Sequence, residues 1–172
     1  DVYKRQGETF LALFERTLAL LNKIAPDVRI LVRRHPATLP EYIGYQDEVI
    51  ARSVNKNVQL TKWHTSMLCH LSCGMIANAY SSTFDIARSL GVETIEFTHY
   101  SQAFLKLTDG RSTRPDMTSF FVQDDDDAFT FALKNLLSRV DVKQGTTSAI
   151  NDSKETDAEF RAVSLLLSAK KL

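Results

Sequence analysis

The stretch Gly74–Phe97 reads GMIANAYSSTFDIARSLGVETIEF and alternates between apolar runs, a hydroxyl-rich turn and an amphipathic run. The apolar run Gly74–Tyr80 has the composition of a buried strand. Ser81–Leu90 is expected to be a helix that Gly91 ends, because glycine is common just after a helix. Thr94–Phe97 predicts the next strand. A strand, a helix and a second strand in this order form the repeating unit of a parallel sheet.

The same alternation continues on both sides of this stretch. Val28–Arg34 and Ser119–Gln123 are expected to be buried strands, and Val58–Thr61 a short one. Loop structure is expected over His99–Pro115. The remaining helices are expected over Gly7–Ala25, within Thr38–Arg52, over His64–Ser72 and over Ala128–Leu137. The sequence therefore predicts an α/β domain with a Rossmann-like, mostly parallel sheet and helices on both faces.

Length and composition indicate one globular domain. The chain has 172 residues, of which 44% are hydrophobic and 24% charged, and it is too short for two full Rossmann domains. Its formal net charge is zero, which argues against a nucleic-acid partner because such proteins usually carry a basic excess. Cys69 and Cys73 lack further paired ligands, so we expect reduced thiols rather than a zinc site or a disulfide framework.

Residues outside the range 7–140 are expected to lie apart from this domain. Residues 1–6 (DVYKRQ) resemble translated adapter sequence at the ends of metagenomic reading frames, with an ordinary exposed terminus as the alternative. They are expected to be non-native or disordered. Residues 141–154 are rich in Gly, Thr, Ser and Asn and predict a linker. Residues 155–172 predict a C-terminal helix, because four apolar residues share one helical face. These residues are Phe160, Val163, Leu166 and Leu167.

The hydroxyl-rich turn is the first candidate site. Ser81, Ser82 and Thr83 lie between a strand and a helix, where free backbone N–H groups and the positive end of the helix dipole favour an anion. Asp85 follows in the first helical turn, where a carboxylate could accept hydrogen bonds from ribose hydroxyls. The alternative is an ordinary helix cap, which uses Ser or Thr without any ligand.

The second candidate site is the sequence VRRHP at residues 32–36, which ends the first expected strand. Strand alternation directs Arg33 and His35 to one side of the sheet and Arg34 to the other. A guanidinium and an imidazole at this position could neutralise a diphosphate. The alternative is that both arginines are solvated or paired and that His35 caps the loop.

Together the two motifs resemble those of two-Rossmann-domain (GT-B) glycosyltransferases. The sequence STFDIA at residues 82–87, followed by LGVE at residues 90–93, resembles a donor-binding motif of the form Ser-Thr-x-Glu-Ala and Leu-Gly-x-Pro. RRHP resembles the Arg/Lys-x-His-Pro motif of bacterial capsule, teichoic-acid and related surface-polysaccharide transferases. Asp85 replaces the usual Glu and is one methylene shorter, and Glu93 stands where Pro is common. The resemblance covers roughly Leu11–Leu137.

The resemblance implies that this chain is the C-terminal, nucleotide-sugar-binding half of such an enzyme, inactive without its N-terminal half. It implies that the donor diphosphate is bound by Arg33, His35, Ser81, Ser82 and Thr83. Asp85 is then the ribose-binding residue and His99 a candidate donor contact, whereas the catalytic residues are unknown. The final helix is expected to cross to the other domain.

Neither a metal nor a cofactor is implied, since the nucleotide-sugar is the substrate. The acceptor, a glycan or a lipid-linked molecule, would bind through the N-terminal domain. A cytoplasmic setting is expected, with attachment of the intact protein to the inner face of the membrane left open.

Several alternatives remain open from the sequence. Half of a nucleotide-sugar epimerase of the UDP-N-acetylglucosamine 2-epimerase kind would share the fold and a similar serine-rich site. A non-catalytic α/β binding module would share only the fold. The four acids Asp124–Asp127 suit the positive end of a helix, and a metal site is the alternative reading. Trp63 is expected to be a packing residue.

Overall fold

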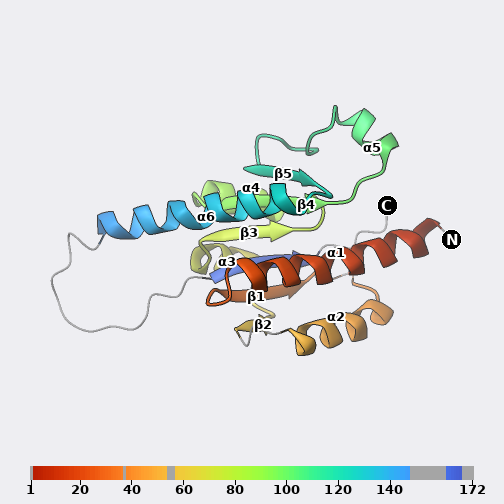
Figure 1. The fold of residues 1–172 in the computed structure, drawn as a ribbon, viewed down its shortest axis with the longest axis horizontal. Coiled ribbons are helices and arrows are strands. Elements are labelled where there is room, and N and C mark those ends of the chain that lie inside the picture. Colours follow the sequence, from red (N-terminus) through yellow and green to blue (C-terminus); the bar gives the residue numbers. More distant parts are fainter. Residues whose placement is uncertain (1, 37, 54–56, 148–161, 168–172) are drawn as a thin grey trace.

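Strands in the described part of the chain form one sheet in the order β2-β1-β6-β3-β4-β5, and every neighbouring pair is parallel (Figure 1). The computed structural model describes residues 2–36, 38–53, 57–147 and 162–167. The strands are β1 Arg29–Arg34, β2 Val58–Leu60, β3 Gly74–Ala77, β4 Glu93–Thr98, β5 Phe120–Gln123 and β6 Ala162–Leu167. The predicted Rossmann-like α/β fold is confirmed.

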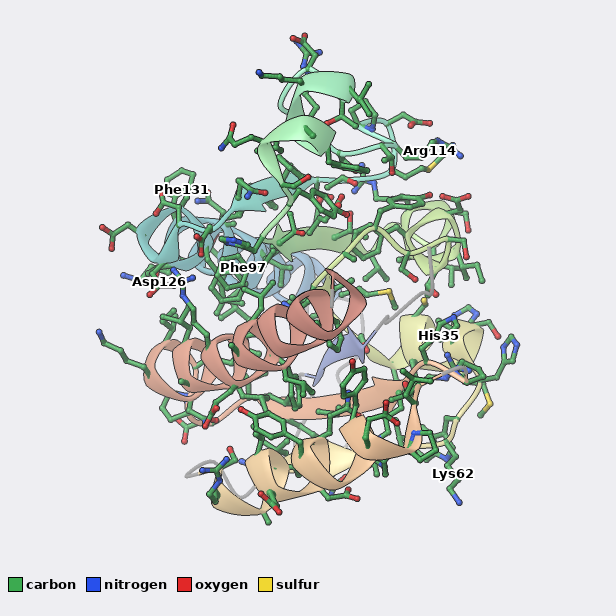
Figure 2. All side chains as sticks on the ribbon, turned by 90° about the vertical axis from the view of Figure 1, so that its right-hand side faces the viewer. His35, Lys62, Phe97, Arg114, Asp126 and Phe131 are labelled. Carbon is green, nitrogen blue, oxygen red and sulfur yellow. The ribbon has the colours of Figure 1, made fainter. Side chains whose placement is uncertain are left out.

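Helices cover both faces of the sheet. They are α1 Val2–Ile24, α2 Pro40–Arg52, α3 Thr65–Leu71, α4 Thr83–Ser89, α5 Gln102–Leu107 and α6 Asp126–Thr147. Figure 2 views the edge at which the strands end, with α1 and α6 on one side of the sheet and α3 and α4 on the other. No helix in the described ranges has the length and apolar character of a membrane span.

Apolar clusters on both faces of the sheet hold these layers together. In β3, the side chain of Ile76 packs in the larger cluster with Phe14 of α1 and Phe129 of α6, and all three are fully buried. Its neighbour Met75 packs on the opposite face with Phe84 of α4. Successive side chains alternate between the faces of a strand, so a continuous apolar run is what a strand covered on both sides requires.

The C-terminal segment is a strand, which corrects the predicted helix over residues 155–172. Ala162–Leu167 lies between β1 and β3 and pairs with both. Over six residues, an apolar run fits one helical face and a doubly covered strand equally well, and periodicity alone cannot separate the two. The expected crossing of a final helix to another domain is therefore also wrong. Residues 155–161 and 168–172 lie outside the described residues.

Three other boundaries differ from the prediction. Helix α1 begins at Val2, so residues 2–6 are helical rather than disordered. Helix α6 continues to Thr147 and includes the first half of the expected linker, whose residues 148–154 lie outside the described ranges. The expected loop His99–Pro115 contains α5, which Ser101 caps by accepting a hydrogen bond from the Phe104 N–H. Composition is a weak guide to such boundaries, because a helix can continue through polar residues and glycine.

Candidate functional site at the carboxyl edge of the sheet

The residues of both sequence motifs follow strands that end at the same edge of the sheet. His35 follows β1, the hydroxyl run Ser81–Thr83 follows β3, and His99 follows β4. These strands all belong to one parallel sheet, so their carboxyl ends share one edge. This edge faces the viewer in Figure 2, where His35 is labelled.

The direction in which successive strands are added across the sheet reverses between β1 and β3. From β1 the chain moves outward to β2, whereas from β3 it moves the opposite way to β4 and β5, and β6 fills the position between them. In doubly wound sheets, ligands bind outside the carboxyl ends of the strands at such a reversal. His35 and Ser81 therefore follow the two strands that flank the reversal.

At the end of β1, the two arginines have different partners. The Arg33 Nε donates to the Trp63 carbonyl at 3.0 Å, which joins the motif to the segment that follows β2. Arg34 turns to α2, where its Nε donates to the Gln46 Oε1 at 2.9 Å and its guanidinium forms an ion pair with Asp47. The two arginines thus turn to different neighbours, as the predicted alternation requires of them, and Arg34 ties α2 to the sheet.

The start of α4 separates the roles of the three hydroxyl residues. The Ser81 Oγ accepts a hydrogen bond from the Thr83 N–H at 3.3 Å, and the Ser81 carbonyl accepts from the Phe84 N–H at 2.9 Å. Ser82 is exposed, and its side chain makes no capping hydrogen bond. The capping role that the sequence left open thus belongs to Ser81, and the Ser82 hydroxyl is not used for it.

Asp85 lies at the centre of a cluster that the motif alone did not reveal. The Tyr80 phenol donates to the Asp85 Oδ1 at 2.8 Å, and the Arg114 Nη1 lies 3.8 Å from the Asp85 Oδ2. Burial, and secondly the hydrogen bond to Asp85, raise the pKa of Tyr80 to about 12, so the phenol keeps its proton at neutral pH. The Asp85 carboxylate is thus held between a phenol and a guanidinium.

Arg114 comes from the segment between α5 and β5, and Figure 2 shows it at this edge. It also binds Asp116 with two nitrogens, at 3.1 Å and 3.0 Å. The hydrogen bond from Arg114 lowers the pKa of Asp116, and the same bond raises the pKa of Arg114. Its side chain is 44% exposed, so part of the guanidinium is open to a ligand.

His99 points away from this cluster, toward α1. Its Nδ1 lies 2.8 Å from the Asp124 Oδ2, and Asp124 is also paired with Arg16 of α1. The hydrogen bond from Arg16 lowers the pKa of Asp124. His99 therefore shares the carboxyl edge with the motif residues, but its ring is on the α1 side of the sheet, whereas Asp85 is on the α4 side.

Trp63 is exposed, contrary to the expected packing role. The residue is 51% exposed, and its carbonyl accepts from Arg33. A tryptophan before a short helix looks like a core residue in the sequence. In the structure Trp63 follows the end of β2 at the carboxyl edge, where its carbonyl contacts Arg33.

Comparisons of this chain with protein-family models, curated proteins and solved structures find no match. The site must therefore be interpreted from its chemistry. Within residues 2–147 and 162–167, the described positions include no group of three or more His, Cys, Asp or Glu side chains that could hold a metal ion. Of the acids at the start of α6, Asp125 caps the helix, because its Oδ1 accepts from the Asp127 and Ala128 amides at 2.9 Å. Asp124 and Asp126 instead form ion pairs with Arg16.

Proposed function

We propose that this chain is the donor-binding half of a two-Rossmann-domain glycosyltransferase that builds a bacterial surface polysaccharide. The observation that carries the proposal is the position of the two motifs. They resemble a donor-binding pair in sequence, and they follow the two strands that flank the chain reversal. A non-catalytic α/β module would not need both motifs at that edge in order to fold.

The chemistry of the edge suits a nucleoside diphosphate. Arg33 and His35 supply cationic and imidazole groups at the end of β1, and Ser82 supplies a hydroxyl that no cap uses. Charge-assisted hydrogen bonds from such groups are the usual means of binding phosphate oxygens. Asp85 is the proposed ribose contact, since each carboxylate oxygen has two lone pairs and can accept from a ribose hydroxyl beside Tyr80 or Arg114.

In the proposed reaction, a sugar or related group is transferred from the nucleotide to a growing glycan. This domain binds the nucleotide, and a second domain supplies the acceptor site and the base. Because one domain offers only one wall of the cleft, we expect modest affinity, with Kd from about 10 µM to about 1 mM, or roughly 4–7 kcal/mol.

The lone tryptophan makes this proposal easy to test. Trp63 is exposed beside Arg33, so its fluorescence should respond when a ligand occupies the edge. Titration with UDP, CDP, GDP and CMP, repeated by calorimetry, should show saturable binding of at least one nucleotide. Failure of all four with a folded sample would favour a non-catalytic module.

A pair of serine variants makes the test specific. Ser82→Ala removes a hydroxyl that caps nothing and should weaken binding about three- to tenfold, the usual range for one hydrogen bond. Ser89→Ala removes a hydroxyl at the other end of α4 and should leave binding unchanged. Equal affinities for the two variants would place the nucleotide elsewhere.

A further inference from the structure

A fully buried glutamate lies beneath the candidate site. Glu96 of β4 has no exposed surface, and the Tyr100 phenol donates to its Oε1 at 2.6 Å. On the other oxygen, Oε2, it accepts from the Ser112 hydroxyl at 2.5 Å and from the Thr118 hydroxyl at 3.5 Å. Among the described residues, no cation lies within ion-pair distance of this carboxyl, and its side-chain partners are hydroxyl groups.

Two of these hydroxyls each hold a backbone amide that flanks the site. The Tyr100 oxygen accepts from the Tyr80 N–H at 2.9 Å, and the Ser112 Oγ accepts from the Arg114 N–H at 3.3 Å. A hydroxyl has one proton and two lone pairs. Because Tyr100 and Ser112 each donate their proton to Glu96, the lone pairs of each hydroxyl oxygen are left to accept from the backbone amide.

The two amides belong to the residues whose side chains meet at Asp85. The Tyr80 phenol and the Arg114 guanidinium approach opposite oxygens of that carboxylate. Tyr80 also directly precedes the hydroxyl run. One buried carboxyl therefore fixes the backbone on both sides of the cluster, although the two residues are far apart in the sequence.

We propose that Glu96 is a positioning residue, which holds Tyr80 and Arg114 at the spacing that the nucleoside diphosphate site requires. The nature of the ligand rests on the proposed function. The positioning itself does not, and it can be measured on the unliganded chain.

Hydrogen exchange at the two amides tests the positioning. Glu96→Leu removes both acceptor oxygens and should lower the protection of the Tyr80 and Arg114 amides by about tenfold relative to the Ile76 amide of β3. Glu96→Gln retains a polar group of the same shape and should restore most of that protection. Glu93→Leu, a matched change at the other end of β4 where Glu93 pairs with Arg88, should leave both amides unchanged.

The outcomes of this test separate positioning from general stability. If the Tyr80 and Arg114 amides lose protection only in step with Ile76, Glu96 merely stabilises the fold and the proposal is wrong. If Glu96→Leu does not fold, Glu96→Asp, whose carboxylate is one methylene shorter, replaces it with the same two outcomes.

Nucleotide titration then tests the link to binding. Glu96→Leu should weaken the affinity of the nucleotide that binds wild type by about tenfold, with rescue by Glu96→Gln. Unchanged affinity despite lost protection would overturn the role in the site. If the wild-type chain binds no nucleotide, the proposed function fails, and the exchange data still decide whether Glu96 positions the two segments.

Discussion

Burial makes the proton affinity of Glu96 depend on whether the protein is folded. Desolvation raises the pKa of this carboxyl, and the hydrogen bonds from Ser112, Tyr100 and Thr118 offset the effect only in part. The groups that face the carboxyl are these three hydroxyls and the backbone N–H of Tyr80, which carry no positive charge. The folded state therefore holds this proton more tightly than the unfolded state.

The sign of the pH dependence follows from linkage. A raised pKa in the folded state means that the contribution of Glu96 to stability is complete below its unfolded pKa, near 4.3, and is lost as the pH rises through the folded pKa. Wild type should lose stability relative to Glu96→Gln over this interval, by at most about 1.4 kcal/mol per pH unit. Urea unfolding of both proteins between about pH 4 and pH 8 measures the difference, and parallel curves would contradict it.

Residues of this kind could not be found from the sequence. Ser82 and His35 stand out because they belong to motifs, and the rule for parallel strands places them at one edge. Arg114 and Glu96 belong to no motif, and their roles depend on contacts between separate segments. Ser112 links these two residues, because its hydroxyl donates to the Glu96 carboxyl and accepts from the Arg114 N–H. In the sequence it looks like an ordinary loop residue.

At the scale of elements, the contact between α6 and β3 depends on a glycine. A Cβ at Gly74 would lie 2.4 Å from the Leu136 Cδ1, and the Leu136 side chain is fully buried. Gly74→Ala should therefore lower the free energy of unfolding by about 1–3 kcal/mol through overpacking. In the double variant with Leu136→Ala, the effect should be smaller than the sum of the single effects, because removing the leucine makes room for the methyl group.

Gly44 of α2 is the matched control. No atom lies within 4 Å of a Cβ built there, and the residue is exposed. Gly44→Ala should stabilise the protein by about 0.5–1 kcal/mol, since alanine favours a helix over glycine. Denaturant unfolding of the four variants provides the comparison, and additive effects of Gly74→Ala and Leu136→Ala would mean that α6 does not pack on β3 as described.

The sequence identified most elements because local patterns determine them. The apolar run at β1 and the strand–turn–helix unit around α4 are short-range signals, and they predicted the elements within a few residues. Helix α5 was missed because a six-residue helix carries too little periodicity to recognise. Strand β6 was misread as a helix because its identity depends on β1 and β3, which lie far away in the sequence.

For the whole molecule, β6 is what joins the two halves of the sheet. It pairs with β1 on one side and with β3 on the other, and Leu165 lies opposite both Val32 and Ile76. In the described strands, no direct pairing connects the β2–β1 half with the β3–β4–β5 half. The chain reversal at which the candidate site lies therefore has β6 at its centre, and the site depends on that strand for its geometry.

This arrangement predicts a large effect of proline in β6. Leu165→Pro removes a backbone N–H from a central strand and introduces a ring that parallel pairing cannot accommodate, which should destabilise the protein by about 3 kcal/mol or more. The midpoint of thermal unfolding should fall by about 10 °C, and the Val32 and Ile76 amides should lose their protection together. Leu107→Pro, at the exposed end of the peripheral helix α5, should have a much smaller effect. If the Leu165 variant keeps its thermal midpoint and both amides stay protected, the two halves are joined by something other than β6, and the geometry of the edge does not depend on that strand.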